Sequence, residues 1–257
     1  MSNVAVIVPT LGTRDNFLRE SLRSIREAGE AYIVVVAPPS VATSQALAEF
    51  SVEQFVVDPG QGLVHAINRA LLELPSEIAY VNWLGDDDLL APSSIAISKA
   101  VLEAKPKTSF TYGQCKYIDD EGRTIGINKS GAWASKLIFF GPDLIPQPGA
   151  LIRRADLTKI GNLDVGLTHA FDMDMFIKLL KNGEGLYINS WLASFRWHSD
   201  SLSVKTRKKS VIEASKIRRS HFPIILRQVC LLWEIPLAIL VFSAGIVVSL
   251  KTSGKKE

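Results

Sequence analysis

The sequence predicts an α/β protein with a Rossmann-like, mostly parallel sheet. Three observations support this fold class: strand-like apolar runs alternate with helix-like patterns in the first half of the chain, the connections are short, and three consecutive aspartates follow the fourth run. Strands that alternate with helices form right-handed β-α-β units, and such sheets bind ligands at the carboxyl ends of their strands. The aspartates therefore mark the expected ligand-binding edge.

Strand and helix pairs are expected in order through the first half of the chain. Short apolar runs typical of buried parallel strands occupy residues 4–8, 32–36, 54–57 and 78–84. Apolar residues recur at helical spacing between them, as Leu18, Leu22 and Ile25 do in the first helix. The expected helices cover residues 16–29, 41–50 and 62–74, and a fourth begins within 89–101.

After Ser109 the pattern changes to mixed strands and loops. Two runs, 109–119 and 121–127, are predicted to pair as a hairpin across the turn sequence "DDEG". Residues 146–164 read as a loop, a short strand and a turn. An amphipathic helix is then expected from residue 171 to its end at Gly183.

Composition indicates one main globular domain. The chain has 257 residues, of which 47% are hydrophobic and 21% charged, which excludes wholesale disorder. Cys115 and Cys230 are too few for a disulfide framework or a structural zinc site, so we expect reduced thiols. The N-terminus lacks the pattern of a signal peptide, and we expect the main domain in the cytoplasm.

The C-terminal part of the chain predicts membrane association. Basic residues are dense between Lys205 and Arg227 and precede the apolar run 229–250. No aromatic residues interleave the basic ones, so nucleic acid is not an expected partner. As a helix the run would be about 33 Å long, enough to span a bilayer, while a core helix or an interfacial helix is the alternative. If the run spans, the denser basic flank predicts that the main domain lies on the cytoplasmic face of the membrane.

The three aspartates, Asp86, Asp87 and Asp88, raise a question of charge balance. Adjacent carboxylates repel one another and are costly to bury, so such a cluster usually holds a positive group. A divalent cation, Mn²⁺ or Mg²⁺, is the first candidate, because both prefer oxygen ligands. Capping of the following helix is the alternative for any single one of them.

Six motifs in order resemble the family 2 glycosyltransferases, across roughly residues 3 to 204. They are "VAVIVPTLG", "YVNWLGDDDLLAP", "PQPGALIRR", "IGNLD", "FDMDMFIKL" and "FRWHSDSLS". The resemblance implies the GT-A fold, with a nucleotide-sugar-binding half (1–108) and a mixed acceptor half (109–204). The charge and hydropathy pattern adds a basic connector (205–222) and an apolar C-terminal helix within a membrane-associated segment (223–257). The resemblance also implies transfer of a sugar with inversion from a nucleoside diphosphate sugar, foremost a UDP-sugar, to an acceptor. A saccharide or lipid-linked acceptor near the membrane, such as a growing surface polysaccharide, would suit the apolar C-terminus.

The resemblance assigns the donor side residue by residue. Asp87 and Asp88 match the metal-binding aspartates, with His198 as a further ligand or a donor to the diphosphate. Asp86 and Asp87 match donor-binding positions, and Arg196 could hold phosphate oxygens. The remaining positions matched to the nucleotide pocket are Pro9, Thr10, Arg14 and Asp58. The family's acidic residue after the second strand is missing here, so either Asp58 or backbone groups would contact the base.

The resemblance also assigns the acceptor side. Asp172 matches the catalytic base at the start of a helix, and Phe171 stands where the family usually has glutamate. Asp174 is the competing acceptor-side carboxylate, and helix capping is the alternative role for Asp172. The acceptor-facing loop is Gln147, Pro148 and Gly149, although Pro-Gly is also ordinary turn chemistry.

Two other function classes stay open from the sequence. A non-catalytic sugar-nucleotide-binding or scaffold protein of the same fold would fit Phe171 and the missing base-contact acid. A nucleotidyltransferase would also use an α/β sheet and a metal, but a glycine-rich, lysine-bearing loop is expected there. The first loop, "PTLGTRDN", has one glycine and no lysine.

Overall fold

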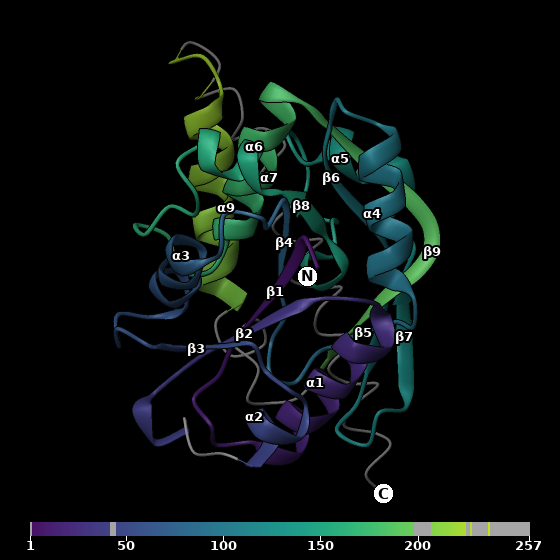
Figure 1. Ribbon diagram of the computed structural model, residues 1–257. Coiled ribbons are helices and arrows are strands. Elements are labelled where there is room, and N and C mark those ends of the chain that lie inside the picture. The colour runs from purple at the N-terminus through teal and green to yellow at the C-terminus, as the bar shows by residue number, and fades with distance from the viewer. Residues whose placement is uncertain (1, 42–44, 198–206, 225–226, 228–235, 237–257) are drawn as a thin grey trace, which may run out of the picture.

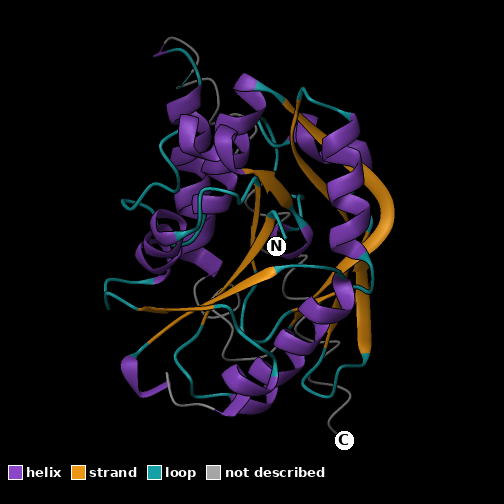
Figure 2. Cartoon of the chain, viewed as in Figure 1, coloured by secondary structure: helices purple, strands orange, loops and turns teal. Residues whose placement is uncertain are grey.

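A computed structural model describes residues 2–41, 45–197, 207–224, 227 and 236 of the chain (Figure 1). Within this part, a nine-stranded sheet runs in the order β3-β2-β1-β4-β8-β6-β9-β5, with β7 paired to β6. Figure 2 shows the strands crossing the middle of the molecule and helices on both sides of them. The predicted α/β class with a mostly parallel nucleotide-binding half is confirmed.

The parallel half follows the predicted order closely. Its strands are β1 (Val4–Pro9), β2 (Tyr32–Ala37), β3 (Gln54–Val57) and β4 (Tyr80–Trp83), and all their mutual pairings are parallel. The connecting elements are α1 (Asp15–Ala28), η1 (Pro39–Val41), α2 (Gln45–Glu49) and α3 (Leu63–Glu73). α2 is shorter than the predicted 41–50, and residues 42–44 lie outside the described part.

Alternate residues of β1 enter two separate cores. Ala5 and Ile7 belong to the apolar cluster that includes α3 and α7, whereas Val4, Val6 and Val8 belong to the cluster that includes α1 and α4. Successive side chains of a strand point to opposite faces, so a continuous apolar run covers both faces at once. This double burial fixes the strand in the middle of the sheet and its carboxyl end at the ligand edge.

The mixed half contains the predicted hairpin and several further elements. In chain order they are β5 (Leu89–Leu90), α4 (Ser94–Ala104), β6 (Thr108–Ile118), β7 (Thr124–Asn128), η2 (Gly131–Trp133), α5 (Ala134–Leu137), η3 (Gln147–Gly149), β8 (Leu151–Arg153), α6 (Arg154–Lys159), α7 (Phe171–Asn182), β9 (Glu184–Arg196) and α9 (Arg207–His221). β6 and β7 pair antiparallel, and α7 ends at the residue before Gly183, both as predicted.

One local expectation was confirmed and another was wrong. The fourth helix, α4, begins at Ser94, late within the predicted range 89–101, and Leu89 and Leu90 before it form a short strand on β9. Pro92 explains the delay, because the residue before a proline is disfavoured in helical conformation. α6 occupies part of the region predicted as a turn.

The C-terminal prediction falls mostly outside the described residues. The basic connector becomes helix α9 as far as it is described, and Figure 1 shows α9 beside α7 and α6. Among the described residues, no helix is long and apolar enough to cross a membrane. Of the apolar run 229–250, only Pro236 belongs to the described part.

Candidate active site

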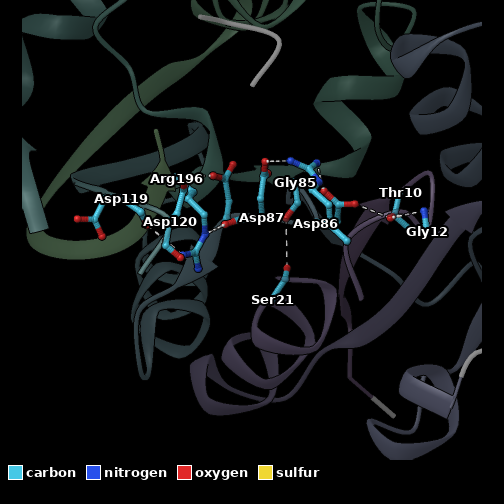
Figure 3. A network of polar contacts seen from close by, with 11 residues as sticks. Thr10, Gly12, Ser21, Gly85, Asp86, Asp87, Asp119, Asp120 and Arg196 are labelled. Carbon is cyan, nitrogen blue, oxygen red and sulfur yellow. Dashed lines mark hydrogen bonds and ion pairs between the residues drawn. The ribbon is translucent and has the colours of Figure 1, made fainter. Parts of the chain in front are cut away.

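The three aspartates sit in a tight turn directly after β4. The turn, residues 85–88, is closed by a hydrogen bond from the Asp88 N–H to the Gly85 carbonyl at 3.1 Å, and is called the acidic turn below. The Ser21 hydroxyl of α1 donates to the same carbonyl at 3.2 Å. Figure 3 shows Asp86 facing Thr10, the residue after β1, while Arg196 lies on the other side of the turn. The turn therefore lies at the predicted carboxyl edge.

Arg14 is the positive group that the acidic turn holds. Its guanidinium contacts Asp86 Oδ1 at 2.5 Å and Asp87 Oδ2 at 2.6 Å, and the Thr10 hydroxyl donates to Asp86 Oδ2 at 2.5 Å. Burial raises the pKa of Asp86 above its ordinary value, although the hydroxyl and Arg14 oppose this. Thr10 and Arg14, which the resemblance assigns to the nucleotide pocket, thus lie beside the acidic turn, which already has a cationic partner within the chain.

Arg196 supports the acidic turn from behind. Its side chain is 1% exposed, and its Nη2 pairs with Glu20 at 2.6 Å. Its Nε donates to the Asp87 carbonyl at 2.9 Å, its Nη1 donates to the carbonyls of Asp119 and Asp120, and its backbone N–H donates to Asp88 Oδ1 at 2.9 Å. This geometry differs from the expected phosphate contact, because the guanidinium is buried among protein acceptors.

The remaining oxygens of Asp87 and Asp88 lie on one side of the turn. A Cβ on Gly85 would meet Asp87 Oδ1 at 2.8 Å and Asp88 Oδ2 at 3.1 Å, so both oxygens are packed over this glycine. Burial, followed by the charge of Asp87, raises the pKa of Asp88 well above its ordinary value. A nearby cation would relieve this cost.

These residues fit a divalent cation in their chemistry. Mg²⁺ is usually bound by one or two carboxylates together with substrate phosphates, and Asp87 and Asp88 offer hard oxygen atoms of that kind. Within the described residues, no three His, Cys, Asp or Glu side chains form a complete metal site. The expected third ligand, His198, lies outside those residues.

The predicted acceptor loop is tied to the end of β4. The Gln147 side chain donates to the Trp83 carbonyl at 2.8 Å. Asn82, buried in β4, donates through Nδ2 to the carbonyls of Pro148 and Ala150, each at 2.9 Å. Gly149 packs closely on β9, since a Cβ there would meet Leu192 Cβ at 3.0 Å. The loop is therefore held rigidly near the acidic turn.

Asp172 occupies the first turn of α7, next to the same end of β4. The ring of the preceding Phe171 lies 6.3 Å from that of Trp83, centroid to centroid. The Met173 N–H donates to Asp172 Oδ1 at 2.9 Å. Burial raises the pKa of Asp172 to about 6, against the effect of backbone hydrogen bonds and with a further contribution from the charge of Glu213. A carboxylate with this pKa suits general base chemistry near neutral pH.

Asp143 is a second carboxyl group close enough to interact with Asp172. The Ile145 N–H donates to its Oδ1 at 2.9 Å, while its Oδ2 is buried without a hydrogen-bond partner among the described residues. Burial and then the charge of Asp172 raise the pKa of Asp143 well above its ordinary value. The two carboxyl groups therefore lie close enough that the charge of one disfavours ionisation of the other.

Asp174 points toward α9 and is not grouped with Asp172. Its carboxylate pairs with Lys178 at 2.6 Å and with His221 at 2.9 Å, and it is nearly buried. Burial raises its pKa, but these two partners outweigh that effect and hold the pKa below its ordinary value. The geometry thus separates two carboxylates that the sequence left in competition.

The remaining predicted donor residues lie along the same edge of the sheet. Pro9 is the last residue of β1, and the Asp58 N–H after β3 bonds the carbonyl of Ala37. Asp58 Oδ1 accepts the N–H of Gly60 at 2.9 Å, so it also shapes its own turn. A shallow depression of about 310 Å³, lined by residues 13–17, adjoins this edge at Arg14.

Four residues of this region were not singled out from the sequence. Gly85 and Asn82 stood inside the quoted motif "YVNWLGDDDLLAP", so a polar residue within an apolar strand and a glycine before three carboxylates were available signals. Asp143 and Glu213 lie in unrelated parts of the chain. No local pattern connects either of them to Asp172.

Comparison with solved structures confirms the GT-A fold. The Pyrobaculum calidifontis mannosyltransferase PcManGT, in complex with GDP-Man and Mn²⁺, superposes with a TM-score of 0.67 at 16% identity, over 98% of this chain and 79% of that one. S. aureus TarS 1–349 in complex with UDP-GlcNAc gives 0.63 at 16% identity, over 89% and 70%. GalNAc-T7 with UDP, GalNAc and Mn²⁺ superposes with a TM-score of 0.58 at 14% identity, over 76% of this chain and 44% of that one.

These similarities concern the fold. Without its ligands, TarS 1–349 is matched over 64% of its length, and the longer TarS structure over 42%. The chain therefore spans less than two thirds of several structures it resembles. No family model and no curated protein matches the sequence.

Proposed function

We propose that this chain is a glycosyltransferase that moves a sugar from a nucleoside diphosphate sugar to a saccharide or lipid-linked acceptor, with inversion at the anomeric carbon. The observation that carries the proposal is the placement of two kinds of carboxylate around the end of β4. The acidic turn offers Asp87 and Asp88 for a cation, and α7 offers Asp172 with its raised pKa. Solved structures of the same fold hold UDP, UDP-GlcNAc or GDP-Man, two of them with Mn²⁺.

The donor would bind along the carboxyl edge of β1 and β4. Asp87 and Asp88 would hold Mn²⁺ or Mg²⁺, with His198 as the expected further ligand. When bound, the cation would neutralise the diphosphate and stabilise it as a leaving group. Arg14 contacts Asp86 and Asp87, and it fixes the orientation of both carboxylates before the donor arrives.

Asp172 would act on the acceptor. Its carboxylate takes the proton of an acceptor hydroxyl, whose oxygen forms a bond to the anomeric carbon. At the same time the bond from that carbon to the diphosphate oxygen breaks, and its electron pair leaves with the nucleoside diphosphate. Attack from the face opposite the leaving group inverts the configuration. The loop 147–149, fixed on β4, would form the wall along which the acceptor lies.

A screen of sugar nucleotides tests the donor assignment. UDP- and GDP-sugars, each with Mn²⁺, should raise the melting temperature by about 5 to 10 °C at a 100-fold excess over Kd, because they bind the native state. Slow, metal-dependent hydrolysis of the same nucleotide should accompany binding. Binding without hydrolysis or transfer would favour a non-catalytic binding protein, and no binding by any sugar nucleotide would overturn the proposal.

We also propose that the C-terminal segment 223–257 associates with the membrane and that the catalytic domain works on its cytoplasmic face. Support comes from the basic residues that precede the apolar run 229–250 and from the suitability of a membrane-proximal acceptor. The full chain should then sediment with membranes and resist carbonate extraction, whereas a chain ending at Phe222 should be soluble and bind donor. Recovery of the full chain in the soluble fraction without detergent contradicts this assignment.

A further inference from the structure

Helix α9 carries one acidic side chain that faces the start of α7. The helix sequence "RKKSVIEASKIRRSH" is otherwise strongly basic, and Glu213 is its single carboxylate. The two Glu213 oxygens accept the backbone N–H groups of Thr168, His169 and Ala170. The shortest of these hydrogen bonds are 2.6 Å from His169 and 2.7 Å from Ala170.

These three N–H groups come immediately before α7, whose N-cap residue is Ala170. The first N–H groups of a helix and those just before it have no partner within the helix, and a negative charge there is favoured by the helix dipole. Burial raises the pKa of Glu213, but the three backbone hydrogen bonds outweigh it and hold the pKa below its ordinary value. Glu213 is therefore ionised where it binds the segment.

Asp172 depends on this segment for its position. The donors to its carboxylate are backbone N–H groups, those of Met173 and of Asp172 itself, and residues 161–170 before it form turns and bends. The orientation of Asp172 is thus set by the backbone of residues 168–173. Glu213 is the side chain that joins three consecutive N–H groups of this backbone.

We propose that Glu213 is a positioning residue for Asp172: it fixes the backbone before α7 and supplies the negative charge that keeps Asp172 a competent base. This makes α9 part of the catalytic architecture instead of a connector to the C-terminal segment. The inference rests on the proposed function, since it concerns the base of that reaction. Among the described residues, Asp143, from the loop before η3, is the other titratable group close to Asp172.

Other contacts hold α9 in place, so Glu213 can be replaced without detaching the helix. His221, at the other end of α9, contacts Asp174 at 2.9 Å and Lys181 at 2.8 Å, both on α7. Arg218 of α9 also donates to the Gly141 carbonyl at 3.1 Å. Replacing Glu213 should therefore leave α9 docked on α7.

The test compares Glu213→Gln with Glu213→Asp and a control, Glu53→Gln. The glutamine keeps the size and one acceptor oxygen but loses the charge, so the acid limb of the pH–rate profile should move down by roughly half a unit to one unit. kcat should fall roughly tenfold with an unchanged donor KM, because the base is displaced while the donor site is not. Glu213→Asp keeps the charge, so its acid limb should stay near that of the wild type while kcat falls.

Glu53 is a matched control because it also accepts a backbone N–H, from Ile33 at 2.7 Å, and pairs with Arg26 far from α7. Glu53→Gln should leave both kcat and the profile unchanged. An unaltered profile and kcat in Glu213→Gln, or an equal change in Glu53→Gln, overturns the inference. Carboxyl NMR titration of Asp172 in the same variants reads its pKa without any substrate. It therefore tests the inference even if no sugar nucleotide proves to be a donor.

Discussion

The acidic turn and the first turn of α7 use the same residue type in opposite environments. In the acidic turn, Asp86 and Asp87 pair with Arg14, and Asp88 accepts a backbone N–H from Arg196. At the start of α7, Asp172 faces the carboxyl groups of Asp143 and Glu213, and no described cation is paired with it. Aspartates near cations suit the binding of a charged ligand, whereas a partly buried aspartate near other carboxyl groups suits proton transfer.

This comparison predicts its largest effect at Asp172. Asp172→Asn keeps the shape and removes the proton acceptor, so transfer should fall by roughly 10²- to 10⁴-fold while donor binding persists. Asp174→Asn is the matched control on the same helix, since that carboxylate is already engaged by Lys178 and His221. A larger loss of transfer in Asp174→Asn would mean that the base is the other carboxylate.

The second prediction concerns the acidic turn. Replacing both Asp87 and Asp88 by Asn should abolish Mn²⁺-dependent donor binding, measured by titration calorimetry with and without EDTA. The sequence alone predicts no structural loss, because the carboxylates repel one another without a cation and lose nothing structural when they are neutralised. The structure corrects this reason: the ion pair of Asp87 with partly exposed Arg14 is lost, at a cost of up to about 1 kcal/mol in urea unfolding. Equal donor affinity in the wild type with and without EDTA would contradict the metal assignment.

The smallest effect is expected at Gly85. In Gly85→Ala the new Cβ would lie 2.8 Å from Asp87 Oδ1, so the carboxylate must move. Metal-dependent donor affinity should fall roughly tenfold while the fold is kept, because displaced ligand groups weaken metal binding. Gly126→Ala is the control, since its Cβ would make an ordinary 3.4 Å contact with Tyr117. Unchanged affinity in Gly85→Ala would show that the packing of Asp87 over this glycine has no role in binding.

The position of the acidic turn was easier to predict from the sequence than the surroundings of Asp172, for a physical reason. β1 and β4 are continuous apolar runs, and strand ends in a parallel sheet meet at one edge, so the aspartates could be placed at that edge from the strand order. Thr10 and Arg14 were assigned through the family resemblance. The partners of Asp172 come from the loop before η3 and from α9. How close these partners lie to Asp172 depends on the packing of α7 against other elements. The spacing of apolar residues along one segment of the sequence does not reveal that packing.

The same reasoning explains two individual differences. Arg196 was expected near phosphate because arginine suits that role, but its burial against Glu20 and three backbone carbonyls depends on the long β6–β9 pairing. α9 was read as a basic connector because basic residues dominate its sequence. It packs through Ile217 and Ala214 on the apolar cluster that includes α7, and the polar contacts of Glu213 and His221 add to this docking.

The raised pKa of Asp172 also predicts how stability depends on pH. The carboxyl group has an ordinary value of 3.8 when unfolded and about 6 in the folded chain. Between these pH values the folded state binds more protons, so this group's contribution to the free energy of unfolding falls as pH rises from about 4 to 6. Urea unfolding of Asp172→Asn should lack that fall, and an identical pH dependence in both proteins would contradict the burial of an ionising Asp172.

The central claim is that the acidic turn binds the charged ligand while Asp172 takes the proton. The pH–rate profile of transfer tests this claim most directly. With saturating donor and Mn²⁺, the account predicts that log kcat rises with unit slope below pH of about 6 and levels above it, as Asp172 loses its proton. Asp172→Asn should retain only a low rate without this limb. A wild-type rate that is flat from pH 5 to 7, or an acid limb that survives in Asp172→Asn, would show that Asp172 is not the base.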